Sequence, residues 1–192
     1  ICNNTALEDD HLILAVDVIQ KVREGASLIV ANSTLASTDQ HLATLAVDPM
    51  RGRASYFWNA VMQDLLNRGI LNTDGVPGSE DFSKERSCDL EVSAAKAGVE
   101  IDDIHAAADL IAGAENIVVV HSPDRPQDAA PADMEIFADL ALLLRNTGKA
   151  TDLLLPRLLA NSAGLDVAGA DPAFMTGRVP LEEKRLPGAA NS

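Results

Sequence analysis

Short apolar runs that alternate with longer amphipathic stretches constrain the fold of this chain more than any other feature of its sequence. The clearest run is Asn116–His121, which is apolar, β-branched and bounded by turn-forming residues. Ser27–Ala31 and Ala43–Val47 are shorter runs of the same kind, and Ile1–Asn4 resembles the end of a further strand. Such runs are typical of strands that are buried on both faces of a parallel sheet.

Helical patterns lie between these runs. Apolar residues at helical spacing predict a helix from about Asp9 to Glu24, and another over Ala54–Asn67 that Gly69 ends. Further helices are expected over Glu80–Lys96, over Ile104–Ala112 and from Pro131 to near Gly148. Strands separated by helices predict a doubly wound α/β fold, a mostly parallel sheet with helices on both faces.

The length of 192 residues suits one ordinary domain. We expect an α/β domain over residues 1–160 and an extended C-terminal arm over residues 161–192, because the sequence beyond Pro156 is rich in Gly and Pro. The chain opens on a strand-like segment without Met, so we expect it to be a fragment of a larger subunit.

The charge and the cysteines narrow the possible partners and cofactors. A formal net charge of -14 disfavours binding to nucleic acid or to anionic membranes, and no apolar stretch reaches the length of a membrane span. Cys2 and Cys88 are too few for an iron–sulfur cluster and lack C-x-x-C spacing. These features predict a cytoplasmic protein with reduced thiols.

The common catalytic and ligand-binding motifs are absent from the sequence. The four histidines form no H-x-x-x-H pattern, no G-x-S-x-G precedes a helix, and no G-x-G-x-x-G or P-loop follows a strand. Acidic pairs such as Asp9-Asp10 and Asp102-Asp103 fit the capping of helix starts better than acid–base catalysis. The sequence therefore predicts no catalytic residue and no metal site.

Three stretches of the sequence, taken in order, resemble motifs of a known protein family. Ile1–Asn4, a helix and then Gly25–Ser33 resemble a strand, a G-x-N-P loop, a helix and a GAKLIVIDPR strand. Leu140–Lys149 is similar to LALLTGNIGK, and Leu155–Gly164 is similar to the opening of LPLRGEANSQGARDMGVLP. These motifs resemble the molybdopterin oxidoreductase family, in the branch that includes a subunit of NADH-quinone oxidoreductase and the formate dehydrogenases. The resemblance implies the Rossmann-like central domain of the formate dehydrogenase and DMSO reductase type.

In cofactor-binding members, this domain holds one nucleotide arm of a molybdopterin guanine dinucleotide. The resemblance implies that the cofactor-binding residues, if a pterin dinucleotide binds, are Asn4, Asn32, Ser33, His121 and Ser122. Asn32, however, stands where the family has an acid near a ribose. In Asp48–Ser55, which aligns with RPGTDAAL, Gly52 replaces the Asp that reads guanine. Each loss would remove about 1–3 kcal/mol of binding.

The resemblance thus implies a scaffold domain, of the kind in the NADH-quinone oxidoreductase subunit, with no redox centre in this stretch. Its partners would be other domains of the parent subunit and other subunits of an oxidoreductase complex, peripheral to the inner membrane. The parent protein would carry iron–sulfur clusters and molybdopterin guanine dinucleotide. Two alternatives remain: a dinucleotide-binding domain of a molybdenum or tungsten formate dehydrogenase-like enzyme, and the nucleotide-binding middle domain of a thiamine-diphosphate enzyme.

Overall fold

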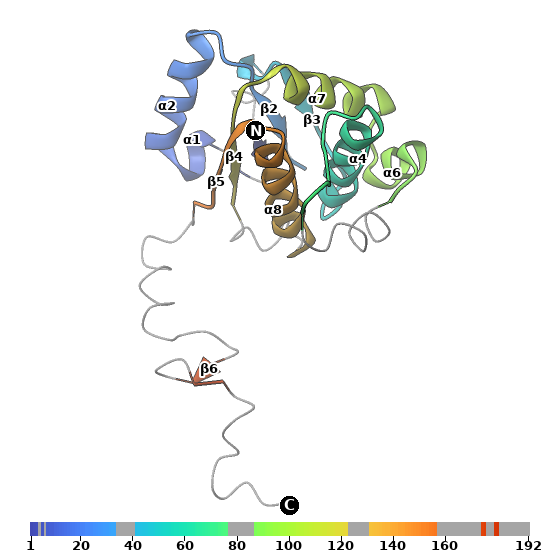
Figure 1. Ribbon diagram of the computed structural model, residues 1–192. Coiled ribbons are helices and arrows are strands. Elements are labelled where there is room, and N and C mark those ends of the chain that lie inside the picture. Colours follow the sequence, from blue (N-terminus) through green and yellow to red (C-terminus); the bar gives the residue numbers. More distant parts are fainter. Residues whose placement is uncertain are drawn as a thin grey trace, which may run out of the picture. The chain divides into compact units, whose positions relative to one another are not determined.

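A five-stranded, all-parallel sheet forms the centre of the computed structural model, which describes residues 1–3, 5, 7–33, 41–76, 87–122, 131–156, 174–175 and 179–180. Its strands are β1 (Cys2–Asn3), β2 (Ile29–Ala31), β3 (Leu45–Val47), β4 (Asn116–His121) and β5 (Ala150–Leu154). They lie in the order β3-β2-β1-β4-β5 (Figure 1). The chain therefore winds from β1 toward β3 first and then returns to wind the opposite way through β4 to β5.

Helices lie on both sides of this sheet (Figure 1). They are α1 (Leu7–Asp10), α2 (Leu12–Arg23), α4 (Ala54–Asn67), α6 (Leu90–Ala97), α7 (Ile101–Gly113) and α8 (Pro131–Asn146). α1 and α2 lie on one side, and α4, α7 and α8 lie on the other. Right-handed parallel connections require this change of side when the direction of winding reverses. The expected α/β architecture with a parallel sheet is present.

The side of the sheet that faces α4, α7 and α8, called the α8 face, carries the main core. Ile29, Ala31, Ile117 and Val119 point to this face and pack among buried side chains of the helices. Phe57, Trp58 and Phe137 form its aromatic centre, with ring centroids 4.9 Å apart for the first pair and 5.1 Å for Trp58 and Phe137. These few aromatic residues are concentrated where the fold is best packed.

The opposite side, called the α2 face, has a smaller core. Cys2, Leu28, Val30 and Val120 point to this face and are buried with Leu7 and Ala15. Ala15 is the only described residue of α2 that is buried. Leu12, Ile13 and Val16 of the same helix are largely exposed to solvent. The apolar spacing of α2 thus predicts a helix but not which of its stripes packs on the sheet.

Several predicted bounds are wrong. The helix expected over Glu80–Lys96 begins only at Leu90, where the Asp89 carboxylate accepts a hydrogen bond from the Val92 N–H at 2.9 Å. Residues 80–86 lie outside the described part of the chain. The helix expected from Asp9 is interrupted at His11, so that Asp9-Asp10 ends α1 and does not cap a helix start. The strand β5 was not expected.

The helix expected over Ile104–Ala112 begins earlier, at Ile101, and Asp102 and Asp103 lie in its first turn. The Asp103 carboxylate accepts a hydrogen bond from the Glu100 N–H at 3.3 Å. This acidic pair therefore does act at a helix start, as expected.

The chain divides into two compact units, residues 1–156 and residues 157–192. The described part of the second unit is an antiparallel pair of short strands, β6 (Phe174–Met175) and β7 (Val179–Pro180). Among the described residues, none of the helices has the length and hydropathy needed to cross a bilayer.

Candidate functional site

The carboxyl ends of β1, β2 and β4 meet at the point where the winding of the sheet reverses. β1 pairs with β2 on one side and with β4 on the other, in a register that places Asn3 beside Ala31 and His121. Ligands of open parallel sheets bind at such a point, beyond the strand ends. The residues that follow the three strands therefore form the first candidate site.

Asn3 is the centre of a buried polar network at this site. Its Oδ1 accepts a hydrogen bond from the Trp58 indole N–H at 2.8 Å, and its Nδ2 lies 3.0 Å from Nδ1 of His121. Because an indole nitrogen can only donate, Trp58 fixes the orientation of the Asn3 amide. The amide nitrogen in turn must donate, so Nδ1 of His121 accepts and the ring is neutral with its proton on Nε2.

The surroundings of His121 also favour the neutral ring. The residue is buried, and its ring lies 5.4 Å from that of Phe137 between centroids. Desolvation by burial lowers the pKa of His121 below its usual value of 6.5. His121 is therefore a neutral, buried residue of the core, and the lone pair of its Nδ1 accepts a hydrogen bond from the Asn3 amide.

Asn32 forms a second hydrogen-bonded group with the loop that follows β1. Its Oδ1 accepts a hydrogen bond from the Thr5 backbone N–H at 3.0 Å, and its Nδ2 donates to the Thr5 carbonyl at 2.8 Å. The Thr5 hydroxyl donates to the carbonyl of Asn3 at 3.0 Å. Both Asn32 and Thr5 are buried. The Asn32 amide therefore clamps the backbone after β1 through two hydrogen bonds.

The serine residues at the strand ends differ from each other. The Ser122 hydroxyl donates to the Pro156 carbonyl at 3.3 Å and is buried. The Ser33 hydroxyl oxygen is also buried, but it has no hydrogen-bond partner among the residues that the structure describes. Asn4, the fifth residue expected here, lies outside the described residues.

Asn32, Ser33, His121 and Ser122, which the resemblance implies as cofactor contacts, lie after strand ends at one edge of the sheet. Sequence reasoning missed Asn3, Thr5 and Trp58, which hold Asn32 and His121 in place. A signal was available for Trp58, because a buried indole N–H usually finds an acceptor. Among the described residues, the amide and imidazole groups of this edge are already used in hydrogen bonds within the protein, whereas the Ser33 hydroxyl has no partner.

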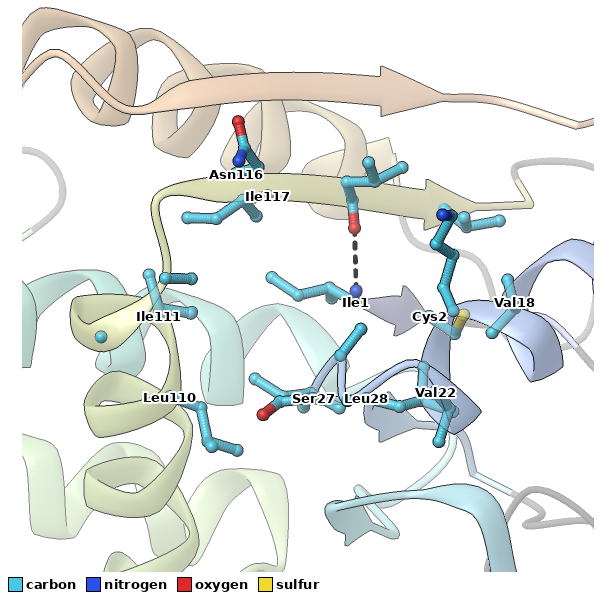
Figure 2. A pocket seen from close by; sticks show the side chains of 18 of the residues that line it. Ile1, Cys2, Val18, Val22, Ser27, Leu28, Leu110, Ile111, Asn116 and Ile117 are labelled. Atoms are coloured by element: carbon cyan, nitrogen blue, oxygen red, sulfur yellow. Dashed lines mark hydrogen bonds between the residues drawn. The ribbon is translucent and has the colours of Figure 1, made fainter.

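A second feature, the amino-edge trough, lies at the opposite ends of the strands and continues over the α2 face. Its volume is about 930 Å³, and its lining includes Val18, Val22, Leu110, Val118 and Leu154. Figure 2 shows Val18 and Val22 approaching from α2, Leu110 and Ile111 from α7, and Asn116 and Ile117 at the start of β4. The floor is held by the β1–β4 pairing, in which Ile1 N donates to the Val118 carbonyl at 2.8 Å (Figure 2). Nothing in the sequence pattern predicted this trough.

Within the described ranges, no three side chains of His, Cys, Asp or Glu gather in a way that could hold a metal ion. The fold and the strand-end site define the class as a parallel α/β protein with polar groups at its winding reversal. Compared with known proteins, the chain matches no protein-family model and no curated protein.

Proposed function

We propose that this protein is a Rossmann-like scaffold domain of a molybdopterin-type oxidoreductase subunit, of the kind found in the related subunit of NADH-quinone oxidoreductase. The strand order β3-β2-β1-β4-β5 supports the Rossmann-like assignment, because dinucleotide-binding folds use the same order. The motif resemblances at Gly25–Ser33, Leu140–Lys149 and Leu155–Gly164 support the family. The domain itself carries no redox centre in this proposal.

The surroundings follow from the same proposal. The parent subunit holds the iron–sulfur clusters and any molybdopterin guanine dinucleotide, and this domain packs against other parts of that subunit and against other subunits. The assembly is cytoplasmic and peripheral to the inner membrane. Fold alone carries no function, so this step rests on the family resemblance.

The observation that carries the scaffold role is the double hydrogen bond between Asn32 and Thr5. In the family, an acid at the position of Asn32 is expected near a ribose. Here both polar atoms of the side chain are used by the Thr5 backbone. These two bonds fix the amide against the backbone after β1, and turning it toward a ribose would break them and leave buried groups unpaired, at a cost of about 1–3 kcal/mol for each group.

The test is a calorimetric titration of the full 192-residue chain with guanosine diphosphate. We expect no saturable heat, whereas the apoprotein of a formate dehydrogenase that binds the dinucleotide gives a saturable isotherm as the positive control. Molybdenum, tungsten and oxidised pterin are measured in the freshly purified protein. Saturable binding of guanosine diphosphate, or a stoichiometric pterin, would overturn the scaffold role.

One observation favours the second candidate, a dinucleotide-binding domain of a formate dehydrogenase-like enzyme. The buried Ser33 hydroxyl, at the end of β2, has no partner among the described residues and could donate to a ribose or phosphate oxygen. Under this alternative, Ser33→Ala weakens binding of guanosine diphosphate, whereas Ser122→Ala, whose hydroxyl already donates to Pro156, has a smaller effect.

A further inference from the structure

Among the described residues, part of the α2 face is left open above β4 and β5. Val118 points to this face because it alternates with Ile117 and Val119, which pack on the α8 face. Leu154 pairs with Val120, a residue of the α2-face core, so it points the same way. Val118 is 46% exposed and Leu154 is 43% exposed. Parallel sheets are normally covered on both faces, so an open apolar stretch of this kind is unusual.

The winding of the chain explains why this stretch is open. The connection from β1 to β2 places α2 on the α2 face, over the first half of the sheet. The connections from β3 to β4 and from β4 to β5 run in the other direction, and they place α4, α7 and α8 on the α8 face. A further right-handed connection outward from β5 would again lie on the α8 face. Among the described elements, the winding of this sheet therefore places no helix above Val118 and Leu154.

The amino-edge trough has the shape and chemistry of a seat for such a helix. One wall is the side of α2 that carries Leu14, Val18 and Val22, all half-buried, and the floor includes Val118 and Leu154. Asp17 and Glu115 lie among the lining residues and are exposed. Lys21, which also lines the trough, forms an ion pair with Glu24 at 2.7 Å and interacts more weakly with Asp17. The trough thus has an apolar floor with acidic groups beside it.

We propose that the amino-edge trough binds an amphipathic helix of a partner polypeptide, with an apolar stripe seated on Val118 and Leu154 and with Lys or Arg beside Asp17 and Glu115. A helix of about ten residues is about 15 Å long, slightly shorter than the twelve-residue α2 that forms one wall of the trough. Opposite charges across an interface select the partner. The inference does not depend on the chemistry of the parent protein.

Two other occupants fit the trough less well. A second copy of this chain would bring two proteins of formal charge -14 and two sets of acidic groups together, which electrostatic repulsion opposes. A small apolar ligand would be expected in a site that encloses most of its surface, whereas Val118 and Leu154 are open to solvent. Both occupants become outcomes of the test.

The test uses the full chain with methyl groups of Val and Leu labelled for NMR, and three synthetic peptides of fourteen residues. The first is a helical peptide with a Leu stripe and Lys on its other faces. The second replaces Lys by Glu, and the third is the first peptide with two central residues replaced by proline, which prevents a helix. We expect saturable shifts for the first peptide only, confined to the Val and Leu methyl groups that line the trough, among them those of Val18, Val22, Val118 and Leu154.

Variants show whether the trough is the binding site. The neutral double substitution Val118→Thr with Leu154→Gln changes exposed side chains and should weaken binding at least tenfold. Leu142→Gln, a change at a 53% exposed residue of α8, is the matched control and should leave the affinity unchanged. Equal binding by the double variant and the parent protein, equal binding of the Lys and Glu peptides, or no localised shifts at millimolar peptide would overturn the proposal.

Self-association is measured in parallel by sedimentation. We expect a monomer that does not change with the double substitution. A dimer that the double substitution dissociates would identify a second copy as the occupant and would overturn the proposal of a basic partner helix. The result is independent of guanosine diphosphate binding at the other end of the strands, so this proposal and the scaffold role can fail separately.

Discussion

The two faces of the sheet are made by the same short strands but are buried to very different degrees. Among the described residues, the core of the α8 face contains 23 buried apolar side chains, whereas the core of the α2 face contains six. All of the buried aromatic residues in these cores lie on the α8 face. We therefore expect the packing of the α8 face to contribute more to the stability of the described domain than the packing of the α2 face.

The largest expected effect comes from truncating one leucine side chain to alanine on each face of the sheet and comparing the losses of stability. Leu140→Ala removes a fully buried side chain of the α8 face and should lower the free energy of unfolding by about 2–5 kcal/mol. Leu14→Ala, at a half-buried residue that packs on the α2-face core, should cost about 1 kcal/mol. Urea unfolding measures both. Equal losses would show that the two faces contribute equally to stability and would contradict the proposed difference between them.

The next effect concerns the polar network inside the α8 face. Asn3→Leu leaves the indole N–H of Trp58 and Nδ1 of His121 without their partner in a buried place, so it should cost about 2–4 kcal/mol. Trp58→Phe in the same background removes one of the two unpaired groups. We therefore expect the double variant to lose less than the sum of the two single losses, as measured by a double-mutant cycle in urea. Simple additivity would contradict the network.

Helices and strands could be predicted from the sequence where a single local pattern determines both the type of element and its bounds. α4 and β4 have the bounds that their patterns predict, because both are buried against the core and carry uninterrupted apolar periodicity. β5 was missed because it is an edge strand whose Thr and Asp interrupt the apolar run before Leu153. On α2, the stripe with Leu12 and Val16 is as apolar as the stripe that packs, so periodicity alone could not choose between them.

The candidate site shows the same limit. Asn32 and His121 could be placed at strand ends, because a parallel sheet brings its carboxyl ends to one edge. Their partners could not be predicted, since Thr5 and Trp58 come from a loop and a helix whose approach depends on packing. Whether a strand-end polar group is free for a ligand or used by the protein is decided by these partners. The scaffold proposal rests on the finding that Asn32 is bonded to the Thr5 backbone within the protein.

A smaller effect is expected when Asn32 is changed to the acid that the family carries. Asn32→Asp keeps an acceptor for the Thr5 N–H but loses the donor to the Thr5 carbonyl and places a buried carboxylate beside that oxygen. We expect a loss of about 1–3 kcal/mol at neutral pH. Because a protonated carboxyl can donate, the loss should shrink as the pH is lowered. A variant as stable as the parent protein at pH 7 would show that the clamp contributes little.

The smallest expected effect is the contribution of His121 to the pH dependence of the free energy of unfolding. Burial lowers the pKa of the folded ring below 6.5, and the unfolded ring keeps its ordinary pKa, so the unfolded state binds the proton first as the pH falls. Stability should therefore be full above pH 6.5 and decrease as the pH drops from 6.5 toward the lowered pKa. His121→Asn keeps an acceptor for the Asn3 amide but cannot titrate, so this variant should lose part of the acid slope in urea unfolding followed from pH 7.5 to pH 5. An unchanged slope would mean that the neutral His121 ring is not the source of the pH dependence.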